Sequence, residues 1–309
     1  MKYMCPRCEK YVYPLDFDLA LPRQTKMSAK KQTELGKLSC LLPYESAAEI
    51  YTELRKSTAS KMGAHRSVQV LGAEKEQKEV PAVENPTHAG VDGTMICIRE
   101  EGWKEAQVGA VYKLDKKGRA TEIRYAGKVS ARAEVGMETY RLAGSPSLEA
   151  TSQMALIGDG AVWIDEIHEE HFPNSERIVD FWHASEYVWE VARAFYGQGT
   201  KKAKIWAKIR IHLLKRGKQI SLRRSLSHLH AKTPEQKKSR FDALRYFKNH
   251  GHQMNYPKYR KLGFHIGSGV IESGCKHVVQ DRMKRSGMRW SRQGAENLLR
   301  LRTYHLNLN

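Results

Sequence analysis

The sequence has no apolar segment close to the roughly 18 residues that a membrane-spanning helix requires. Its first residues, MKYMCPRC, lack the apolar centre of a secretory signal peptide. Only five cysteines occur in 309 residues, which is not the disulfide framework of a small secreted protein. These absences exclude the membrane and secreted classes as first interpretations, and we expect a cytoplasmic protein. The length allows one large domain or two to three modest ones.

Cys5 and Cys8 are the only cysteines spaced as a motif. A CxxC pair is half of a zinc ribbon, because structural zinc takes four ligands, and no second CxxC or His pair follows nearby. The pair is therefore half of a Zn²⁺ site, a redox pair or an inert turn.

Acidic residues are nearly absent from residues 201–261. Nineteen Lys or Arg stand there against Glu235 and Asp242, so 19 − 2 = +17 of the formal net charge of +19 lies in one fifth of the chain. Aromatic residues are interspersed, and this combination is typical of a surface that binds a polyanion. We predict DNA contacts here, although a merely solvated basic surface is the alternative. The predicted contacts are Lys201, Lys202, Lys204, Arg223 and Arg224.

Composition and periodicity divide the chain into six segments. Residues 1–25 are a partial zinc ribbon, 26–78 are helical, 79–88 are a polar linker, 89–198 begin the main domain, 199–262 are a basic helical insertion, and 263–309 complete the main domain. In the second segment, helices over 46–55 and 62–71 flank a small-residue turn, with His65, Arg66 and Gln69 facing outward. This pair is compatible with a DNA-binding helix-turn-helix, although many helix pairs have no such role.

From Ala89 onward the pattern is that of an α/β fold. The order is three hairpin-type strands, a helix, two strands alternating with helices, and a closing helix, or βββαβαβα. We therefore predict an RNase H-like mixed five-stranded sheet, with the basic helical insertion before the last core helix and a small helical N-terminal region. The predicted strands are 90–98, 105–114, 121–129, 153–157 and 177–181. The predicted helices of this part are 132–142, 161–172, 184–196, one from Ser268 to a stop at Gly287, and 295–306.

Three acids lie where this fold would bring them together. Asp92 is on the first strand, Asp159 ends the fourth, and Glu272 is near the start of the helix after Ser268. The first and fourth strands are neighbours in such a sheet, and the last helix packs across them. Close carboxylates need a counter-charge, and hard oxygen ligands suit Mg²⁺, or Mn²⁺ in its place. Two such ions ~3.5–4 Å apart support phosphodiester displacement.

Each acid also has an ordinary interpretation. An acid near a helix start is favoured by the helix dipole, and Asp-Gly is a common turn. A second pair, Asp180 and His183, follows the fifth strand as Asp-Phe-Trp-His. It predicts either an auxiliary group that positions a phosphate or nucleotide, or a structural bond at a helix N-terminus. The helix that carries Glu272 ends in further candidate DNA contacts, namely Lys276, Lys284, Arg285 and Arg289.

Four stretches resemble one group of proteins. VDGTMI…GWKEAQVGAVY, LIGDGAVWI, RIVDFWHASEYVWEVARAFYG and IGSGVIESGCKHVVQDRMKRSGMRWS resemble the ISKra group of bacterial insertion-sequence transposases. The resemblance covers roughly residues 89–309 and implies a DDE transposase that uses Asp92, Asp159 and Glu272, with Asp180 and His183 as a D-x-x-H motif. It also implies element-end and target DNA as partners, a homodimer on DNA, and a nucleoid-associated protein in bacteria.

The family's front end has a further CxxC upstream of Cys5, so the resemblance predicts an N-terminally truncated chain. Two other functions fit the same residues. One is a catalytically inactive DNA-binding remnant of a transposase, and the other is an RNase H-like nuclease without a preference for element ends.

Overall fold

A computed structural model describes residues 3–4, 6–7, 11–12, 27–74, 80–144 and 154–308. The short strands β1 (Tyr3–Met4) and β2 (Tyr11–Val12) pair antiparallel. Cys5 and Cys8, the predicted zinc ligands, lie outside the described residues. Among the helices that are described, none is both long enough and apolar enough to cross a membrane.

The main domain is built on a five-stranded mixed sheet with the order β5-β4-β3-β6-β7. β3 pairs antiparallel with β4 and parallel with β6, β4 pairs antiparallel with β5, and β6 pairs parallel with β7. This topology confirms the predicted RNase H-like sheet. The strands are β3 (His88–Ile98), β4 (Gly102–Leu114), β5 (Ala120–Val129), β6 (Ala155–Gly158) and β7 (Glu176–Val179).

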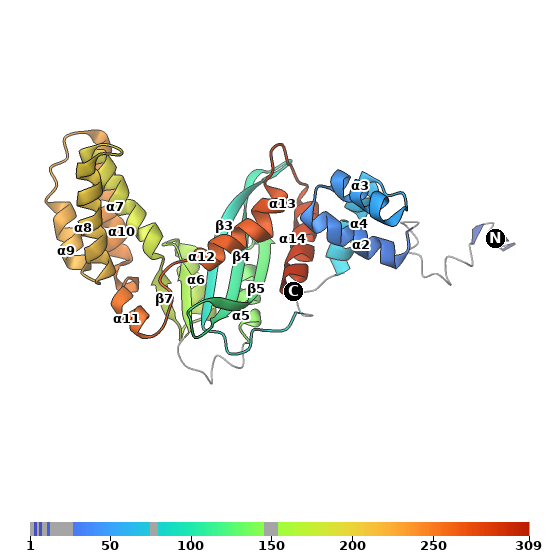
Figure 1. The fold of residues 1–309 in the computed structure, drawn as a ribbon, viewed down its shortest axis with the longest axis horizontal. Coiled ribbons are helices and arrows are strands. Elements are labelled where there is room, and N and C mark those ends of the chain that lie inside the picture. The colour runs from blue at the N-terminus through green and yellow to red at the C-terminus, as the bar shows by residue number, and fades with distance from the viewer. Residues whose placement is uncertain are drawn as a thin grey trace.

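Helices cover both faces of this sheet, which explains why most residues of its central strands are buried (Figure 1). On one face, Val91 and Val111 pack with α5 (Arg132–Leu142) and α6 (Val162–His171). On the other, Ile96 and Val108 pack with the C-terminal helices. Alternate residues of β3 and β4 therefore belong to two different apolar clusters, one on each face of the sheet, and neither face is open to solvent along its whole length.

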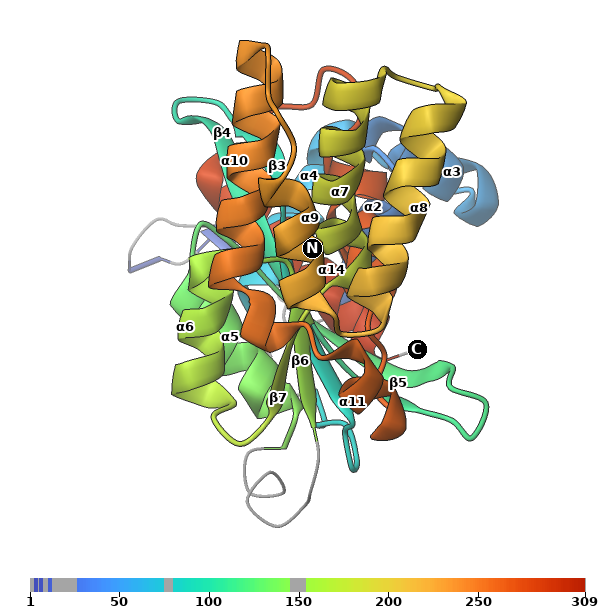
Figure 2. The ribbon, with the colours of Figure 1, turned by 90° about the vertical axis from the view of Figure 1, so that its left-hand side faces the viewer.

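A block of helices extends from the β7 edge of the sheet (Figure 1). It begins with α7, which runs out from β7, and α8 and α10 flank α7 (Figure 2). Their apolar faces join Ile157 of β6 and Ile178 of β7 in one core, so the block is packed onto the sheet. The helices are α7 (Phe181–Tyr196), α8 (Lys201–Lys215), α9 (Gln219–Ser227), α10 (Pro234–Asn249), the 3-10 turn η2 (Gly251–Gln253) and α11 (Tyr256–Lys261).

The N-terminal helices α2 (Ala29–Leu41), α3 (Tyr44–Arg55) and α4 (Lys61–Glu74) pack together on the other side of the molecule (Figure 1). α4 lies against α14 (Arg292–Asn307), and a Cβ added at Gly72 would stand 2.2 Å from the Asn297 carbonyl oxygen. The predicted outward face of α4 is wrong in part. Arg66 is exposed, but His65 packs edge-on against Tyr44, and Gln69 Oε1 accepts a 2.9 Å hydrogen bond from Asn297 Nδ2.

The predicted continuous helix after Ser268 is interrupted. α12 (Gly269–Gly274) passes into a π-helical turn, η3 (Cys275–Gln280), and then α13 (Asp281–Met283). Arg302 of α14 donates from Nε to the Val278 carbonyl at 2.7 Å and from Nη2 to the His277 carbonyl. These bonds satisfy carbonyls in the π-helical turn, whose ladder departs from the α pattern. The interruption therefore depends on a side chain more than twenty residues away in sequence.

Candidate functional site

The structure brings the three predicted acids to one edge of the main domain. Asp92 is the fifth residue of β3, and Asp159 directly follows β6. The parallel register pairs Gly90 with Ile157, and extending it by two residues sets Asp92 beside Asp159. Glu272 lies on α12, which packs across β3 and β4 through the buried Ile271. Two neighbouring strands and one helix thus supply one carboxylate each.

Local hydrogen bonds orient each carboxylate. Asp92 Oδ1 accepts from its neighbour Gly93 N–H at 2.7 Å, and Asp159 Oδ1 accepts from Ala161 N–H at 2.8 Å. Glu272 Oε1 accepts from Ser268 Oγ at 2.6 Å. These contacts use one oxygen of Asp159 and one of Glu272, and the second oxygen of each accepts no hydrogen bond from the described residues.

The acids share an uncompensated negative field. Burial raises the pKa of Asp92, and the charges of Asp159 and Glu272 raise it further, while the Gly93 hydrogen bond opposes them. Burial also raises the pKa of the Cys275 thiol on η3, with Asp92 and Glu272 adding to the effect. Each of these shifts has like-charge repulsion as a contributing cause. A bound cation would relieve it.

The donor set fits a hard divalent cation in its chemistry, because it consists of carboxylate oxygens. Within the described residues, however, no group of three or more His, Cys, Asp or Glu side chains is arranged as a metal site. The three acids are therefore close enough to perturb one another electrostatically without forming a closed coordination shell.

Asp180 connects three elements near these acids through hydrogen bonds, namely β6, α7 and the start of α12. It is 1% exposed and caps α7, with Oδ1 accepting from His183 N–H at 2.5 Å. Its Oδ2 accepts from Ser268 N–H, and Ser268 in turn donates to Glu272. The Asp180 N–H donates to Gly158 O at 2.8 Å. Asp180 thus links β6, α7 and the start of α12, and Ser268 connects it to Glu272.

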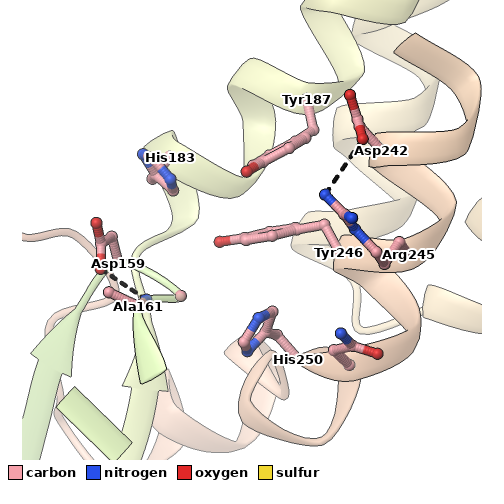
Figure 3. A pocket seen from close by; sticks show the side chains of 10 residues that line it. Asp159, Ala161, His183, Tyr187, Asp242, Arg245, Tyr246 and His250 are labelled. Carbon is pink, nitrogen blue, oxygen red and sulfur yellow. Dashed lines mark hydrogen bonds and ion pairs between the residues drawn. The ribbon is translucent and has the colours of Figure 1, made fainter. Parts of the chain in front are cut away.

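A polar cleft of about 310 Å³ opens beside Asp159. Asp159 and Ala161 form one wall, α7 contributes His183 and Tyr187, and α10 contributes the opposite wall (Figure 3). The Tyr187 and Tyr246 rings are stacked, with centroids 4.0 Å apart and an interplanar angle of 17°. The lining residues are Asp159, Gly160, Ala161, His183, Tyr187, Asp242, Arg245, Tyr246, Asn249 and His250.

Sequence reasoning missed Tyr187, Tyr246 and His250 as members of the site. Tyr246 and His250 belong to the basic insertion, far from Asp159 in sequence, and no local pattern marks them. Gly160 carries an indirect signal, because glycine after an acid allows close approach. A Cβ at Gly160 would meet Tyr246 Cε2 at 2.7 Å and His250 Nε2 at 3.0 Å. The group that approaches this glycine is therefore the protein's own tyrosine.

The predicted DNA contacts fall into two groups, all of them exposed. One group follows α12 along the chain. In it, Lys284 Nζ donates to Thr94 Oγ1 at 3.3 Å, two residues from Asp92, and Arg285 and Arg289 line a hollow with Trp103 of β4. The other group lies on α8 and α9 in the helical block, away from the sheet (Figure 1). The first group comprises Lys276, Lys284, Arg285 and Arg289, and the second comprises Lys201, Lys202, Lys204, Arg223 and Arg224. Arg282, which lies close to Lys284 in the sequence, belongs to neither group, because it is buried and its guanidinium packs on the Tyr44 and Trp290 rings.

An RNase H-like sheet with one acid within β3, one directly after β6 and one on α12 defines the structural class. Compared with profiles of known protein families, the chain matches none. It is 22% identical over 307 residues to a UPF0236 protein of Caldanaerobacter subterraneus subsp. tengcongensis, an alignment that covers 96% of this chain. The chain spans 63% of the length of that relative.

Proposed function

We propose that the protein is a DNA transposase of the DDE type, which cleaves DNA at the ends of an insertion sequence and joins the 3′-hydroxyl to target DNA. The observation that carries this proposal is the placing of Asp92, Asp159 and Glu272 on adjoining elements of an RNase H-like sheet, where burial raises the pKa of Asp92 and the charges of the other two acids add to the effect. The motifs that resemble the ISKra group contain the same three acids.

The distant relative adds support of a different kind. Its name joins eleven locus designations. A single protein encoded at many loci is what a mobile element produces when it copies itself. For the present chain this supports mobility as the biological setting of the proposed cleavage.

Asp92, Asp159 and Glu272 would hold the divalent cation in this function. When bound there, Mg²⁺ or Mn²⁺ supplies activation of a water or 3′-hydroxyl and stabilises the leaving oxygen. The protein's own groups then have defined tasks. Asp180 holds Ser268, and through it Glu272, against β7. Lys284 and its exposed neighbours bind the phosphates of the strand that crosses this edge.

The test compares wild type with Asp159→Asn and Glu272→Gln in two assays, Mn²⁺- or Mg²⁺-dependent nicking of a plasmid that carries the element ends, and duplex binding in Ca²⁺. We expect each variant to lose nicking by about 100-fold or more, because each removes charge stabilisation at the reacting phosphate. DNA binding should be retained. Glu169→Gln on α6, an exposed acid outside the site, is the control with the same charge change.

Three results would redirect the proposal. Nicking retained by both variants would refute the assignment of the acids. Binding by wild type without any nicking would identify a catalytically inactive DNA-binding remnant. Acid-dependent nicking with no preference for element ends over random duplex would identify an RNase H-like nuclease.

A further inference from the structure

The hydroxyl of Tyr246 stands out in the cleft beside Asp159. The residue is 7% exposed, and its hydroxyl oxygen is buried without a hydrogen-bond partner among the described residues. Figure 3 shows the Tyr246 side chain extending from α10, with its hydroxyl toward Asp159 and His183. Burying an unpaired hydroxyl destabilises a fold, so such a group in a native structure calls for a partner that the protein alone does not supply.

Two imidazole side chains, both only partly buried, flank this hydroxyl. His183 has a side chain 39% exposed, and its nearest charged neighbour, Glu186 Oε2, is 3.8 Å from Nδ1. His250 lies on the other side of the Tyr246 hydroxyl and packs against the Tyr246 ring, with centroids 4.9 Å apart (Figure 3). A small movement of His183 would therefore open the space in front of Tyr246 without disturbing the core.

The charges of the lining argue against an anion as the occupant. Asp159 and Asp242 contribute two negative charges and Arg245 one positive charge, and Arg245 Nη2 is already paired with Asp242 Oδ1 at 3.2 Å. What remains is four aromatic or imidazole rings with mixed hydrogen-bond donors and acceptors. Flat rings with donors and acceptors at their edges suit a neutral heterocycle, as in proteins that stack unpaired bases.

We propose that the cleft between α7 and α10 binds one unpaired nucleobase of the DNA strand that is cut. The base inserts in front of the stacked tyrosines, with its polar edge hydrogen-bonded to the Tyr246 hydroxyl and its ring in contact with His183 and His250. Asp159 lines the same cleft, so this nucleotide directly neighbours the phosphate that is cleaved. The inference rests on the proposed function and adds a base-binding subsite to it.

The experiment measures binding of two probes to the full chain in Ca²⁺. One probe is a short single-stranded oligonucleotide, and the other is an oligonucleotide of equal length in which all positions are abasic, so that the phosphate charge is matched. Tyr246→Phe should weaken binding of the first probe by about three- to tenfold, since one hydrogen bond is lost, and leave the second unchanged. His250→Ala should act in the same direction.

Tyr256→Phe is the matched control. Tyr256 is fully buried in the same block, but its hydroxyl already donates to the Val179 carbonyl at 3.1 Å. We expect Tyr256→Phe to lower the melting temperature and bind both probes as wild type does. Tyr246→Phe should not lower the melting temperature, because it removes an unpaired buried group.

The outcomes separate this subsite from the proposed activity. Equal losses for both probes on Tyr246→Phe would overturn the base in favour of a phosphate, and unchanged binding of both would overturn the subsite altogether. Nicking by wild type with no effect of Tyr246→Phe on either probe would leave the transposase proposal standing alone. Selective loss of the base-containing probe, in a protein that never nicks DNA, would leave the subsite standing alone.

Discussion

Replacing Asp180 by Asn tests the connection between the fold and the candidate site. Both carboxylate oxygens of Asp180 accept backbone N–H groups, one from His183 and one from Ser268. An Asn side chain offers only one acceptor oxygen, so its amide nitrogen must face one of the two N–H donors. The variant keeps the volume of the side chain, changes its hydrogen bonding and removes its negative charge.

The expected destabilisation follows from that mismatch. Leaving a buried donor unsatisfied, at a position where Asp180 is 1% exposed, costs about 2–3 kcal/mol. For a domain of this size the loss lowers the melting temperature by roughly 5–10 °C. Because Ser268 also holds Glu272, the same change displaces that carboxylate, and a displacement of order 1 Å reduces nicking by about 100-fold.

The assay is urea and thermal unfolding of Asp180→Asn, with nicking measured at a temperature where the variant is folded. His183→Ala is the control, because His183 contacts Asp180 through its backbone N–H and the substitution leaves that bond intact. Unfolding curves of Asp180→Asn and His183→Ala that coincide would refute the clamp. Loss of stability with normal nicking would refute only its role in positioning Glu272.

Two further predictions concern charge. Burial, reinforced by the nearby His265, lowers the pKa of His88 to about 3, so the folded state resists protonation that the unfolded chain accepts below its usual pKa of 6.5. The free energy of unfolding is therefore unaffected by protonation of His88 above about pH 6.5 and falls by about 1.4 kcal/mol per pH unit as the pH drops toward 3. In urea unfolding, His88→Gln should make the free energy of unfolding less dependent on pH between about pH 5 and 6.5. Parallel pH profiles for the variant and wild type would contradict the assignment. Neutralising Lys201, Lys202 and Lys204 at the start of α8 should lower the slope of log affinity against log salt for DNA binding by up to about 2.7. An unchanged slope would show that α8 is not a DNA surface.

The sheet was predictable because its strands contain short apolar runs and the order of elements restricts the topology. The predicted bounds differ from the structure mainly at strand ends. β4 begins at Gly102 rather than at residue 105, because its first residues pair with the end of β3 in the hairpin while remaining largely exposed, and exposed pairs show no alternation. The break after α12 was not predictable, since Arg302 supplies the hydrogen bonds that accommodate it.

The three acids were found because each sits at a recognisable point of a predicted element. Their meeting follows from strand order, which a sequence can indicate. The role of Asp180 in holding Ser268 required the structure, because the two residues are 88 positions apart. The tyrosines of the cleft were hidden for a similar reason, since in the sequence Tyr246 is one aromatic among many in a basic segment.

The helical block leaves and rejoins the main domain at nearly one point. Asp180 at its start accepts from Ser268 at its end, and Phe181 N–H donates to Ile266 O at 2.8 Å. Everything between these residues is thus inserted at a single point of the chain, yet it packs onto β6 and β7 through one shared apolar core. A substitution on the exposed surfaces of α8 or α9 therefore leaves the three acids untouched, whereas one in α10 can reach Asp159 through Tyr246 and Gly160.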